Sequence, residues 1–295
     1  MKRWVNSLLG RSADARPVKV IGLVPGRNEE ARITFCLRAL SKFTDAIVYL
    51  DDCSDDATVE MVAALADECG VEKIIQKDTW YRDEPGDRNA LLEAGRALGG
   101  THFVVIDADE ALTANCLEGD LLRSRIIALK PREQLALHWI QLWRSVDQYR
   151  DDQSVWSNSF KRCIFCDDGK AKYQSNFIHT SRIPKLKGKR VKLKGGNVGL
   201  LHFHFVNWSN LELKQRWYRC LERVRDPEKS IDAINAKYAD SVDESDLGLS
   251  ASSSEWFEGY DFFDAAIFEL PDAWRLSQME EWAQAHGVDY FDGLD

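Results

Sequence analysis

Residues 18–110 alternate between short apolar runs and segments of helical periodicity, and this alternation constrains the fold more than any other feature. Apolar runs typical of strands occupy residues 18–24, 46–50, 71–75 and 103–106. Apolar side chains at helical spacing occupy residues 29–43, 58–69 and 90–98. Short connections between strands and helices predict βαβ units around a mainly parallel sheet. The runs are almost continuously apolar, as expected for strands with helices over both faces.

The composition restricts the class of protein. The chain has 295 residues, 44% of them hydrophobic, which is enough for one large α/β domain with an extension. The net charge of −9 argues against nucleic acid as the main partner. The sequence contains no apolar run of about 18 residues and no signal-peptide pattern, so neither a membrane span nor secretion is predicted. The seven scattered cysteines are then expected to be reduced thiols in a cytoplasmic protein.

The pattern changes after residue 130. Apolar runs predict strands at residues 135–143, 160–165 and 198–206. Further along, the sequence predicts a helix at 207–225, a polar linker at 240–255 and an aromatic tail that packs back on the domain at 256–295. This half is therefore expected to combine a mixed sheet with loops.

Polar and acidic residues follow three of the four strands predicted in the first half. These segments are residues 25–30, 51–56 and 107–110. Ligands of open parallel sheets bind at the carboxyl ends of the strands, so the segments are expected to form one site. Acidic, Asn and Ser residues also cap helices, and capping alone is the structural alternative at each turn.

Asp107 and Asp109 come directly after the apolar run of residues 102–106. Ionised carboxylates at a strand end repel each other unless a cation or a hydrogen-bond donor partners them. A divalent cation such as Mg²⁺ or Mn²⁺, held by one or two carboxylates and completed by substrate phosphates, is the usual partner. The segment therefore points to an enzyme that handles a nucleotide diphosphate.

Together these motifs resemble the inverting, family 2-like glycosyltransferases with the GT-A fold. The matching residues are 24–30 (VPGRNEE), 47–58 (IVYLDDCSDDAT), Arg88-Asn89 followed by Ala94, and 104–110 (VVIDADE), which contains an Asp-x-Asp (DXD) motif. Residues 201–222 look like the late histidine-plus-helix region of bacterial members that build cell-surface polysaccharide. The resemblance implies an α/β, nucleotide-diphospho-sugar transferase fold, in which a Rossmann-like, mainly parallel sheet is flanked by helices and followed by a C-terminal helical extension.

The resemblance also implies how the chain is divided. The implied parts are an N-terminal lead at residues 1–17, a nucleotide-sugar-binding half at 18–130, an acceptor-binding half of the same domain at 131–226 and a C-terminal extension at 227–295. The implied reaction is a metal-dependent, inverting transfer of a sugar from a nucleotide-diphosphate donor, with UDP favoured, to a glycan or lipid-linked acceptor in polysaccharide biosynthesis. The cytoplasm is the expected location, and peripheral contact with the inner membrane surface is a further expectation.

Roles in the donor site follow from the resemblance, position by position. The loop expected along the nucleoside and the diphosphate contains Pro25, Arg27, Asn28 and Glu29. Asp51 and Asp52 would hydrogen-bond the base and the ribose, and Arg88 would approach the phosphate oxygens. Asp107 would contact the ribose or the metal. Asp109 would ligate the Mn²⁺ or Mg²⁺ ion that bridges the two phosphates.

His202 and His204 stand two residues apart on a predicted strand, so their side chains face the same side. The resemblance implies that a late histidine supplies another metal ligand, with His202 favoured and His204 as the alternative. The competing interpretation is that one or both are ordinary strand histidines with satisfied hydrogen bonds.

The general base is the least defined part of the predicted site. An inverting transfer needs a group that takes the proton of the acceptor hydroxyl, and the resemblance implies an Asp or Glu in the second half. The candidates are Asp147, Asp151, Asp152 and Asp167. Relatives of the surface-polysaccharide type often show His-Glu where this chain has His179-Thr180, and Thr180 cannot act as that carboxylate. Solvated loop carboxylates are the alternative for every candidate.

Three other features attract attention. Cys163 and Cys166 form a single Cys-x-x-Cys with no second pair, so ordinary thiols are expected and not a zinc site. Residues 185–194 (KLKGKRVKLK) are strongly basic, and they form either a solvated hairpin or a patch for an anionic acceptor or a membrane surface. The tryptophans of the half expected to bind acceptor are Trp139, Trp143, Trp156 and Trp208, whose flat rings suit the faces of sugars.

Other functions of an α/β chain fit the sequence less well. A dinucleotide dehydrogenase needs Gly-x-Gly-x-x-Gly after the first strand, which is not present. A sugar nucleotidyltransferase usually opens with a glycine-rich phosphate loop, whereas this first loop has one glycine. An aspartyl-phosphate phosphatase has its Asp-x-Asp after the first strand and not after the fourth. A non-catalytic relative that binds a nucleotide sugar or a glycan stays open as an alternative.

Overall fold

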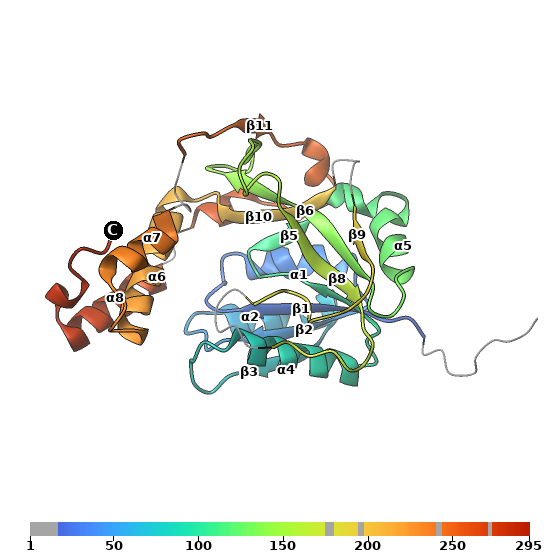
Figure 1. Ribbon diagram of the computed structural model, residues 1–295. Helices are drawn as coiled ribbons and strands as arrows, with labels where there is room; N and C mark the ends of the chain where they lie inside the picture. Colours follow the sequence, from blue (N-terminus) through green and yellow to red (C-terminus); the bar gives the residue numbers. More distant parts are fainter. Residues whose placement is uncertain (1–16, 175–179, 194–197, 240–243, 271–272) are drawn as a thin grey trace, which may run out of the picture.

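The computed structural model describes residues 17–174, 180–193, 198–239, 244–270 and 273–295. Within them, the chain forms an α/β structure around one large mixed sheet (Figure 1). The strand order along the main path is β11-β7-β6-β8-β4-β1-β2-β3, and β10, β5 and β9 pair beside it.

The first half forms the parallel core of the sheet. Its strands are β1 (Val20–Gly26), β2 (Ala46–Asp51), β3 (Val71–Gln76) and β4 (His102–Val105), and all their mutual pairings are parallel. The helices between them are α1 (Ile33–Ser41), α2 (Thr58–Ala64), α3 (Ala66–Cys69) and α4 (Glu84–Ala97). All of β2 is buried, as predicted for a strand covered on both faces. The α/β fold with a central parallel sheet and flanking helices is therefore confirmed.

The helix predicted at residues 58–69 is divided in two. α2 ends before Leu65, whose backbone leaves the helical region at φ −92° and ψ 0°. The second piece, α3, ends at Gly70, which has a positive φ of 68°. A left-handed residue at this position is a common helix terminator, and glycine adopts it without strain.

The second half extends the same sheet. It contains β5 (Glu110–Leu112), η1 (Ala114–Asp120), α5 (Leu121–Ile127), β6 (Gln134–Trp143), β7 (Gln148–Arg150), β8 (Phe160–Cys166), β9 (Arg190–Lys192) and β10 (Gly199–Phe205). β8 runs antiparallel to β4, with Phe165 opposite Phe103, and so joins the two halves into one sheet. Because β10 lies between β5 and β6, it brings its histidines next to the turn between β4 and β5.

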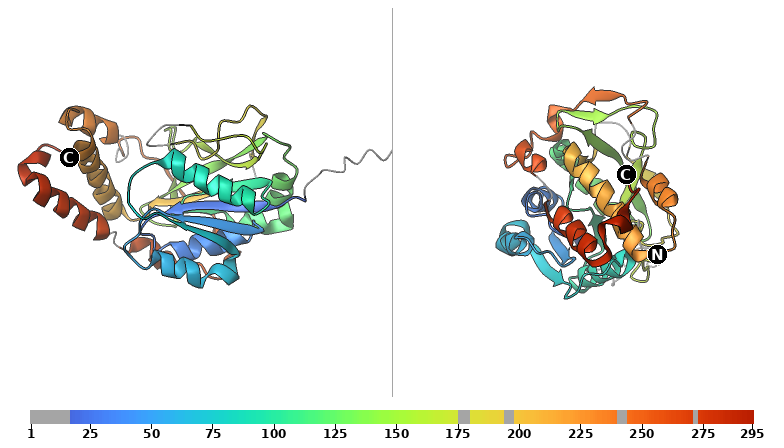
Figure 2. Two further views of the ribbon diagram at one scale, coloured as in Figure 1. Left: turned by 90° about the horizontal axis from the view of Figure 1, so that it is seen from below. Right: turned by 90° about the vertical axis from the view of Figure 1, so that its left-hand side faces the viewer.

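The C-terminal part packs back on the domain, as was predicted for the aromatic tail at residues 256–295. Its elements are α6 (Trp208–Arg225), α7 (Ile231–Ala239), β11 (Leu249–Ala251), η2 (Ser254–Trp256), η3 (Ala265–Glu269), α8 (Ala273–His286) and η4 (Val288–Phe291). Trp256, Tyr260 and Phe268 are buried in the main core. α6, α7 and α8 form a group beyond one end of the parallel strands (Figures 1 and 2). None of the described helices is both long and apolar enough to cross a membrane.

The linker predicted at residues 240–255 is only partly irregular. Residues 240–243 lie outside the described residues, and residues 249–251 form β11. β11 pairs antiparallel with β7, with Ser250 opposite Tyr149. A polar segment can form an edge strand because only its backbone has to pair, and serine-rich composition alone did not reveal this pairing.

Glu222 on α6 ties α6 to α7. Its carboxylate accepts hydrogen bonds from Lys229, Lys237 and Tyr238. Burial alone would raise the pKa of Glu222, but these donors outweigh burial and lower it from 4.5 to about 2. A carboxylate whose pKa is depressed on folding stabilises the protein above its unfolded pKa, and this contribution is lost as the pH falls toward the folded pKa.

We therefore expect Glu222→Gln to lower the free energy of unfolding by about 2 kcal/mol at pH 7, because two ammonium groups lose their charged partner. Urea denaturation at several pH values measures this loss, which should shrink as the pH is lowered from 4.5 toward 2. Glu228→Gln, at an exposed position of the same segment, is the matched control and should stay near wild type. An equal loss at pH 7 and pH 3 would contradict the ionic origin.

Candidate active site

A cleft of about 1050 Å³ lies where the carboxyl ends of the parallel strands face the C-terminal helices. The turns after β1, β2 and β4 form one wall of this cleft, and side chains of α6, α7 and α8 form the opposite wall. The predicted donor residues that line it are Pro25, Arg27, Glu29, Asp52, Arg88, Asp107 and Asp109. The segments that follow three strands therefore do meet at one site.

The first two turns are hydrogen-bonded to each other. The Asn28 amide donates to Asp55 Oδ1 at 2.6 Å, and the Asn28 backbone N–H donates to Ser54 Oγ at 2.9 Å. Asp51 is buried and accepts the backbone N–H and the hydroxyl of Ser54 at 3.0 and 2.5 Å. Asn28 and Asp51 were predicted to contact the donor, but in this structure their polar atoms hold the turns and neither residue lines the cleft.

Asp52 faces the cleft and pairs with a lysine that the sequence did not single out. Lys77 Nζ lies 2.5 Å from an oxygen of Asp52 and 3.1 Å from an oxygen of Asp87. Burial raises the pKa of Asp87 to about 6, although Lys77 opposes the rise. Lys77 therefore links Asp52 and Asp87, which both line the cleft, in one charged cluster.

Arg27 lies between two indole rings that come from distant parts of the chain. Its guanidinium carbon is 4.6 Å from the ring centroid of Trp80 and 5.0 Å from that of Trp274. Burial lowers the pKa of Arg27. Its Nε and Nη1 atoms are buried and have no hydrogen-bond partner among the described residues, so they are available to an anionic ligand.

Arg88 is buried and lines the same cleft. Its Nη2 lies 3.4 Å from Asp107 Oδ1, while Nε and Nη1 find no partner within the described part of the chain. Buried guanidinium N–H groups without acceptors are costly, and phosphate oxygens would satisfy them.

Asp107 and Glu110 share an arginine that the sequence did not single out. Arg182 Nη2 lies 2.8 Å from Asp107 Oδ2 and 2.7 Å from Glu110 Oε1, and its Nη1 also donates to Glu110. Glu110 accepts the indole N–H of Trp139 at 2.7 Å and the backbone N–H of Asp107 at 3.1 Å. The buried Glu110 carboxylate therefore holds the turn between β4 and β5 through its hydrogen bonds to Arg182, Trp139 and the Asp107 backbone.

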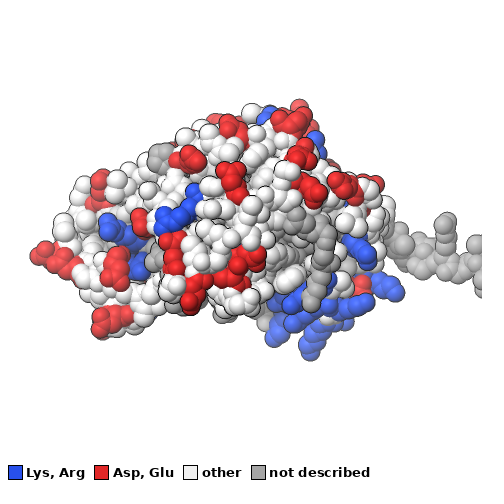
Figure 3. Space-filling view, turned by 90° about the horizontal axis from the view of Figure 1, so that it is seen from above, with Lys and Arg blue, Asp and Glu red and all other residues white. Residues whose placement is uncertain are grey.

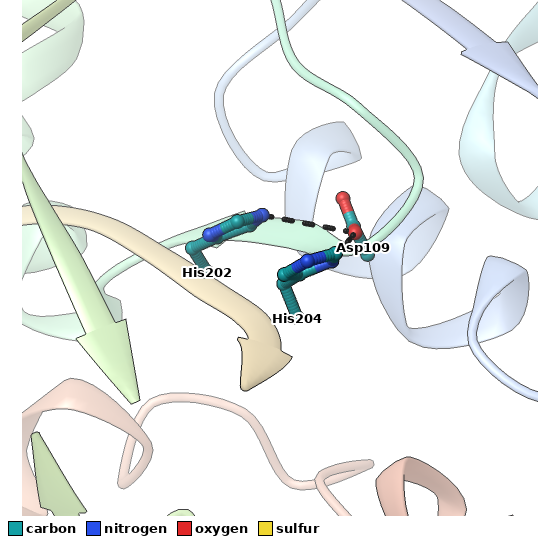
Figure 4. Close-up of side chains that lie close together, drawn as sticks. All are labelled: Asp109, His202 and His204. Carbon is teal, nitrogen blue, oxygen red and sulfur yellow. Dashed lines mark ion pairs between the residues drawn. The ribbon is translucent and has the colours of Figure 1, made fainter. Parts of the chain in front are cut away.

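Asp109 lies beside both predicted histidines (Figure 4). Its Oδ2 is 3.7 Å from His202 Nε2 and 3.8 Å from His204 Nδ1. One ligand atom from each of the three residues lies within 4.8 Å of the others. The two imidazole rings are stacked nearly parallel, 5.2 Å apart. Asp107 does not belong to this group, because its carboxylate pairs with Arg88 and Arg182.

The chemistry of this group suits a divalent cation. Burial lowers the pKa of both histidines, that of His204 to about 4, so both rings are neutral at pH 7, the form that binds metals. His202 Nδ1 hydrogen-bonds Gln141 Oε1 at 2.6 Å, which leaves Nε2 facing Asp109. Lys214 Nζ lies 2.9 Å from His204 Nδ1 and 3.7 Å from Asp109, a neighbour that the sequence did not reveal.

The predicted base candidates lie elsewhere. None of Asp147, Asp151, Asp152 and Asp167 lines the cleft. Asp147 is exposed, and Asp151 accepts the hydroxyl of Ser250 on β11 at 2.8 Å. Asp152 accepts from Arg150, Ser154 and Ser157, and Asp167 pairs with Arg96. Within the described residues, the cleft contains no carboxylate from beyond residue 110.

The cysteines and tryptophans that the sequence singled out lie partly in the hydrophobic core and partly at the cleft. Cys163 and Cys166 are buried free thiols, with pKa values that burial raises to about 12 and about 11, as expected for ordinary thiols. Trp143 is fully buried against Phe205. Only Trp139 and Trp156 of the four tryptophans line the cleft. His179 lies outside the described residues.

Residues 23–121 match the model of a known protein family, described as glycosyl transferase family 2. This segment has the sequence of a glycosyl transferase family 2 domain. The matched residues contain the strand-end segments with Asp52, Arg88, Asp107 and Asp109, whereas His202 and the C-terminal helices lie beyond them. The parallel sheet with its polar strand ends agrees with the GT-A fold that was predicted for this chain.

Solved structures similar to this chain include two of S. aureus TarS and one of a mannosyltransferase. The crystal structure of S. aureus TarS is 15% identical with a TM-score of 0.45, covering 75% of this chain and 43% of its own. TarS 1–349 in complex with UDP is 16% identical with a TM-score of 0.40, covering 60% of this chain and 61% of its own. The mannosyltransferase PcManGT from Pyrobaculum calidifontis, in complex with GDP-Man and Mn²⁺, is 25% identical with a TM-score of 0.28. This match covers 33% of this chain and 29% of the PcManGT chain. The chain thus spans less than half the length of the full TarS structure. No curated protein matches the chain.

Proposed function

We propose that this glycosyltransferase moves a sugar, with inversion and with the help of Mn²⁺ or Mg²⁺, from a nucleotide-diphosphate donor to a glycan or lipid-linked acceptor. UDP is the favoured nucleotide. The observation that carries the proposal is the group of Asp109, His202 and His204, which shares one cleft with the Nε and Nη1 atoms of Arg88, atoms without a partner among the described residues. Cell-surface polysaccharide synthesis and a cytoplasmic location complete the proposal, on the strength of the sequence resemblance.

In this proposal the donor lies along the turn after β1. Arg27 and Arg88 would hydrogen-bond the phosphate oxygens, because both present buried N–H groups without acceptors. Asp52 would accept hydrogen bonds from the nucleoside. The divalent cation would be held by Asp109, His202 and His204, and when bound it neutralises charge that develops on the leaving diphosphate.

The acceptor would enter from the side of Trp139 and Trp156. In an inverting transfer, its hydroxyl oxygen forms a bond to the anomeric carbon while the bond from that carbon to the diphosphate oxygen breaks. The hydroxyl proton passes to a base, and the nucleotide diphosphate leaves with the electron pair. The indole face of Trp156 would orient the acceptor sugar for this attack, since His202 and Lys161 already lie against the ring of Trp139.

One observation favours a second candidate function. Since the described part of the cleft lacks a carboxylate from the acceptor-binding half, a non-catalytic relative that binds a nucleotide sugar also fits the site. Such a protein would use the same donor contacts without turnover.

Isothermal titration calorimetry with UDP and GDP, first with Mn²⁺ and then with EDTA, tests the donor site. We expect one nucleotide to bind at least tenfold more tightly with Mn²⁺, since the cation and the arginines then share the diphosphate charge (about 1.4 kcal/mol). Folded protein that binds neither nucleotide would contradict the proposal. A second measurement, the release of nucleotide diphosphate from nucleotide sugars, separates the two functions, because only the enzyme turns over.

A further inference from the structure

A strongly basic stretch of the chain contributes Arg182 to the cleft, but its other described lysines and arginines do not line the cleft. No Asp or Glu occurs between Asp168 and Glu212, whereas nine Lys and Arg do, in a protein of net charge −9. Figure 3 shows Lys and Arg side chains gathered at one side of the molecule, the side on which β9 lies in Figure 1. Such a concentration of positive charge attracts an anionic ligand.

The register of the sheet connects these cations to the cleft. Lys161 and Arg162 on β8 line the cleft itself. Arg162 and Lys192 lie opposite Ala136 on the two sides of β6, so β9 continues the row of cations from Arg162 to the surface. Lys161, the preceding residue on β8, lies on the other face of the sheet, over Trp139. Lys192 Nζ also lies 4.7 Å from the ring centroid of Phe160, another cleft residue. We call Lys161, Arg162, Arg190 and Lys192 the basic track.

Within the basic track, Lys161 feels the charges of Glu110 and Asp107, whereas Arg162 feels that of Arg190. None of its four side chains takes part in an ion pair within the described residues. Arg162 makes one hydrogen bond to the neutral Gln134 side chain at 3.2 Å. Burial, and the nearby Arg190, lower the pKa of Arg162. These charges repel one another, and an anionic ligand would relieve the repulsion.

Aromatic rings accompany the cations at the inner end of the track. Lys161 Nζ lies 3.7 Å from the ring centroid of Trp139, and Trp156 and Phe160 line the same part of the cleft. Because His202 and Lys161 both lie against the Trp139 ring, the indole open to a sugar ring is that of Trp156. A sugar packed there could extend an acidic substituent to the neighbouring cations. Neither a bare phosphate nor a flat lipid surface would use both features.

We propose that the acceptor is an anionic glycan, whose phosphate or carboxylate groups lie along the basic track while its reacting sugar enters the cleft. This inference rests on the proposed function, because the track matters for catalysis only if the cleft transfers a sugar. A membrane surface would meet the exposed Arg190 and Lys192 and would not reach Lys161 and Arg162. The continuity of the track into the cleft therefore favours a chain-like acceptor.

Fluorescence anisotropy with labelled oligogalacturonate, a carboxylate-bearing glycan, tests the inference on the full chain. At low salt, the double variant Arg190→Gln/Lys192→Gln should bind it roughly 25-fold more weakly, at about fivefold for each lost surface charge. High salt should abolish wild-type binding, because exposed charges are screened. The matched control Lys42→Gln/Lys73→Gln removes two exposed lysines elsewhere and should bind within twofold of wild type.

Binding to neutral dextran and to vesicles of phosphatidylcholine with one quarter phosphatidylglycerol is measured in parallel. These two measurements distinguish an anionic glycan from a neutral glycan and from a membrane surface. Dextran binding equal to that of oligogalacturonate, an unchanged Arg190→Gln/Lys192→Gln variant, or binding to vesicles alone would each overturn the inference. Calorimetry with UDP and Mn²⁺ should give the wild-type affinity in this variant, since neither residue lines the cleft. If UDP fails to bind the wild type while oligogalacturonate binds as expected, the proposed function fails and the basic track stands as a glycan-binding surface.

Discussion

Replacing Asp109 by Asn should reduce sugar transfer by about a thousandfold, the scale of losing one dominant electrostatic contact in a transition state. Asp109 supplies the only negative charge of the group that it forms with His202 and His204. Both imidazoles are neutral, so an asparagine would leave a divalent cation with neutral ligands only. Steady-state release of nucleotide diphosphate at saturating Mn²⁺ measures the loss, and calorimetry should show that Mn²⁺ no longer enhances nucleotide binding.

The Asp109→Asn variant should remain folded. The backbone carbonyl of Asp109 accepts the Phe203 N–H at 3.0 Å, and this bond does not depend on the side chain. Asp147→Asn is the matched control, because it makes the same chemical change at an exposed site outside the cleft. More than a tenth of wild-type turnover in Asp109→Asn would contradict its role as a metal ligand. Loss of turnover in Asp147→Asn would instead support Asp147 as the general base.

The donor half could be predicted because its signals are local. Continuous apolar runs with helical segments between them specify parallel strands whose carboxyl ends lie at one edge. Asp52 and Asp109 follow from that geometry, since each lies just after a strand end, whereas Arg88, on the helix after β3, was implied by the family resemblance. His202 and His204 could be placed on one side of a strand by their spacing alone, and β10 does carry both to Asp109.

The rest of the site depends on contacts between distant parts of the chain. Arg182 meets Glu110 across 72 positions, and no local pattern distinguishes it from the lysines and arginines around it. Trp274 reaches Arg27 from the last long helix, so only the packing of α8 reveals it. The base candidates were chosen by position along the chain, but Asp151 pairs with β11 and Asp152 with its own loop. Identifying which carboxylates are free to act as a base therefore requires the tertiary structure.

Replacing Arg182 by Met should cost about 1 to 3 kcal/mol of unfolding free energy, because the buried carboxyl group of Glu110 loses the arginine N–H groups that it accepts. Glu110 is 1% exposed, and burial raises its pKa to about 7 even with Arg182 beside it. Asp107 keeps Arg88 at 3.4 Å, so the loss should fall mainly on Glu110. Urea denaturation measures the cost. Arg132→Met, which breaks an exposed ion pair with Asp168, is the matched control and should cost less than about 1 kcal/mol.

The double variant Arg182→Met/Glu110→Gln distinguishes a pairing role from simple loss of packing. A glutamine at position 110 carries no charge and can still accept the Trp139 N–H, so removing both charges should recover most of the lost stability. If the two substitutions destabilise additively, Arg182 stabilises the fold by packing and not by neutralising Glu110. Activity should stay low in the double variant even when stability returns, because Arg182 also holds Asp107 at the mouth of the donor site. Recovery of stability without activity would therefore assign Arg182 two separable roles, one in the fold and one in positioning the strand-end carboxylates.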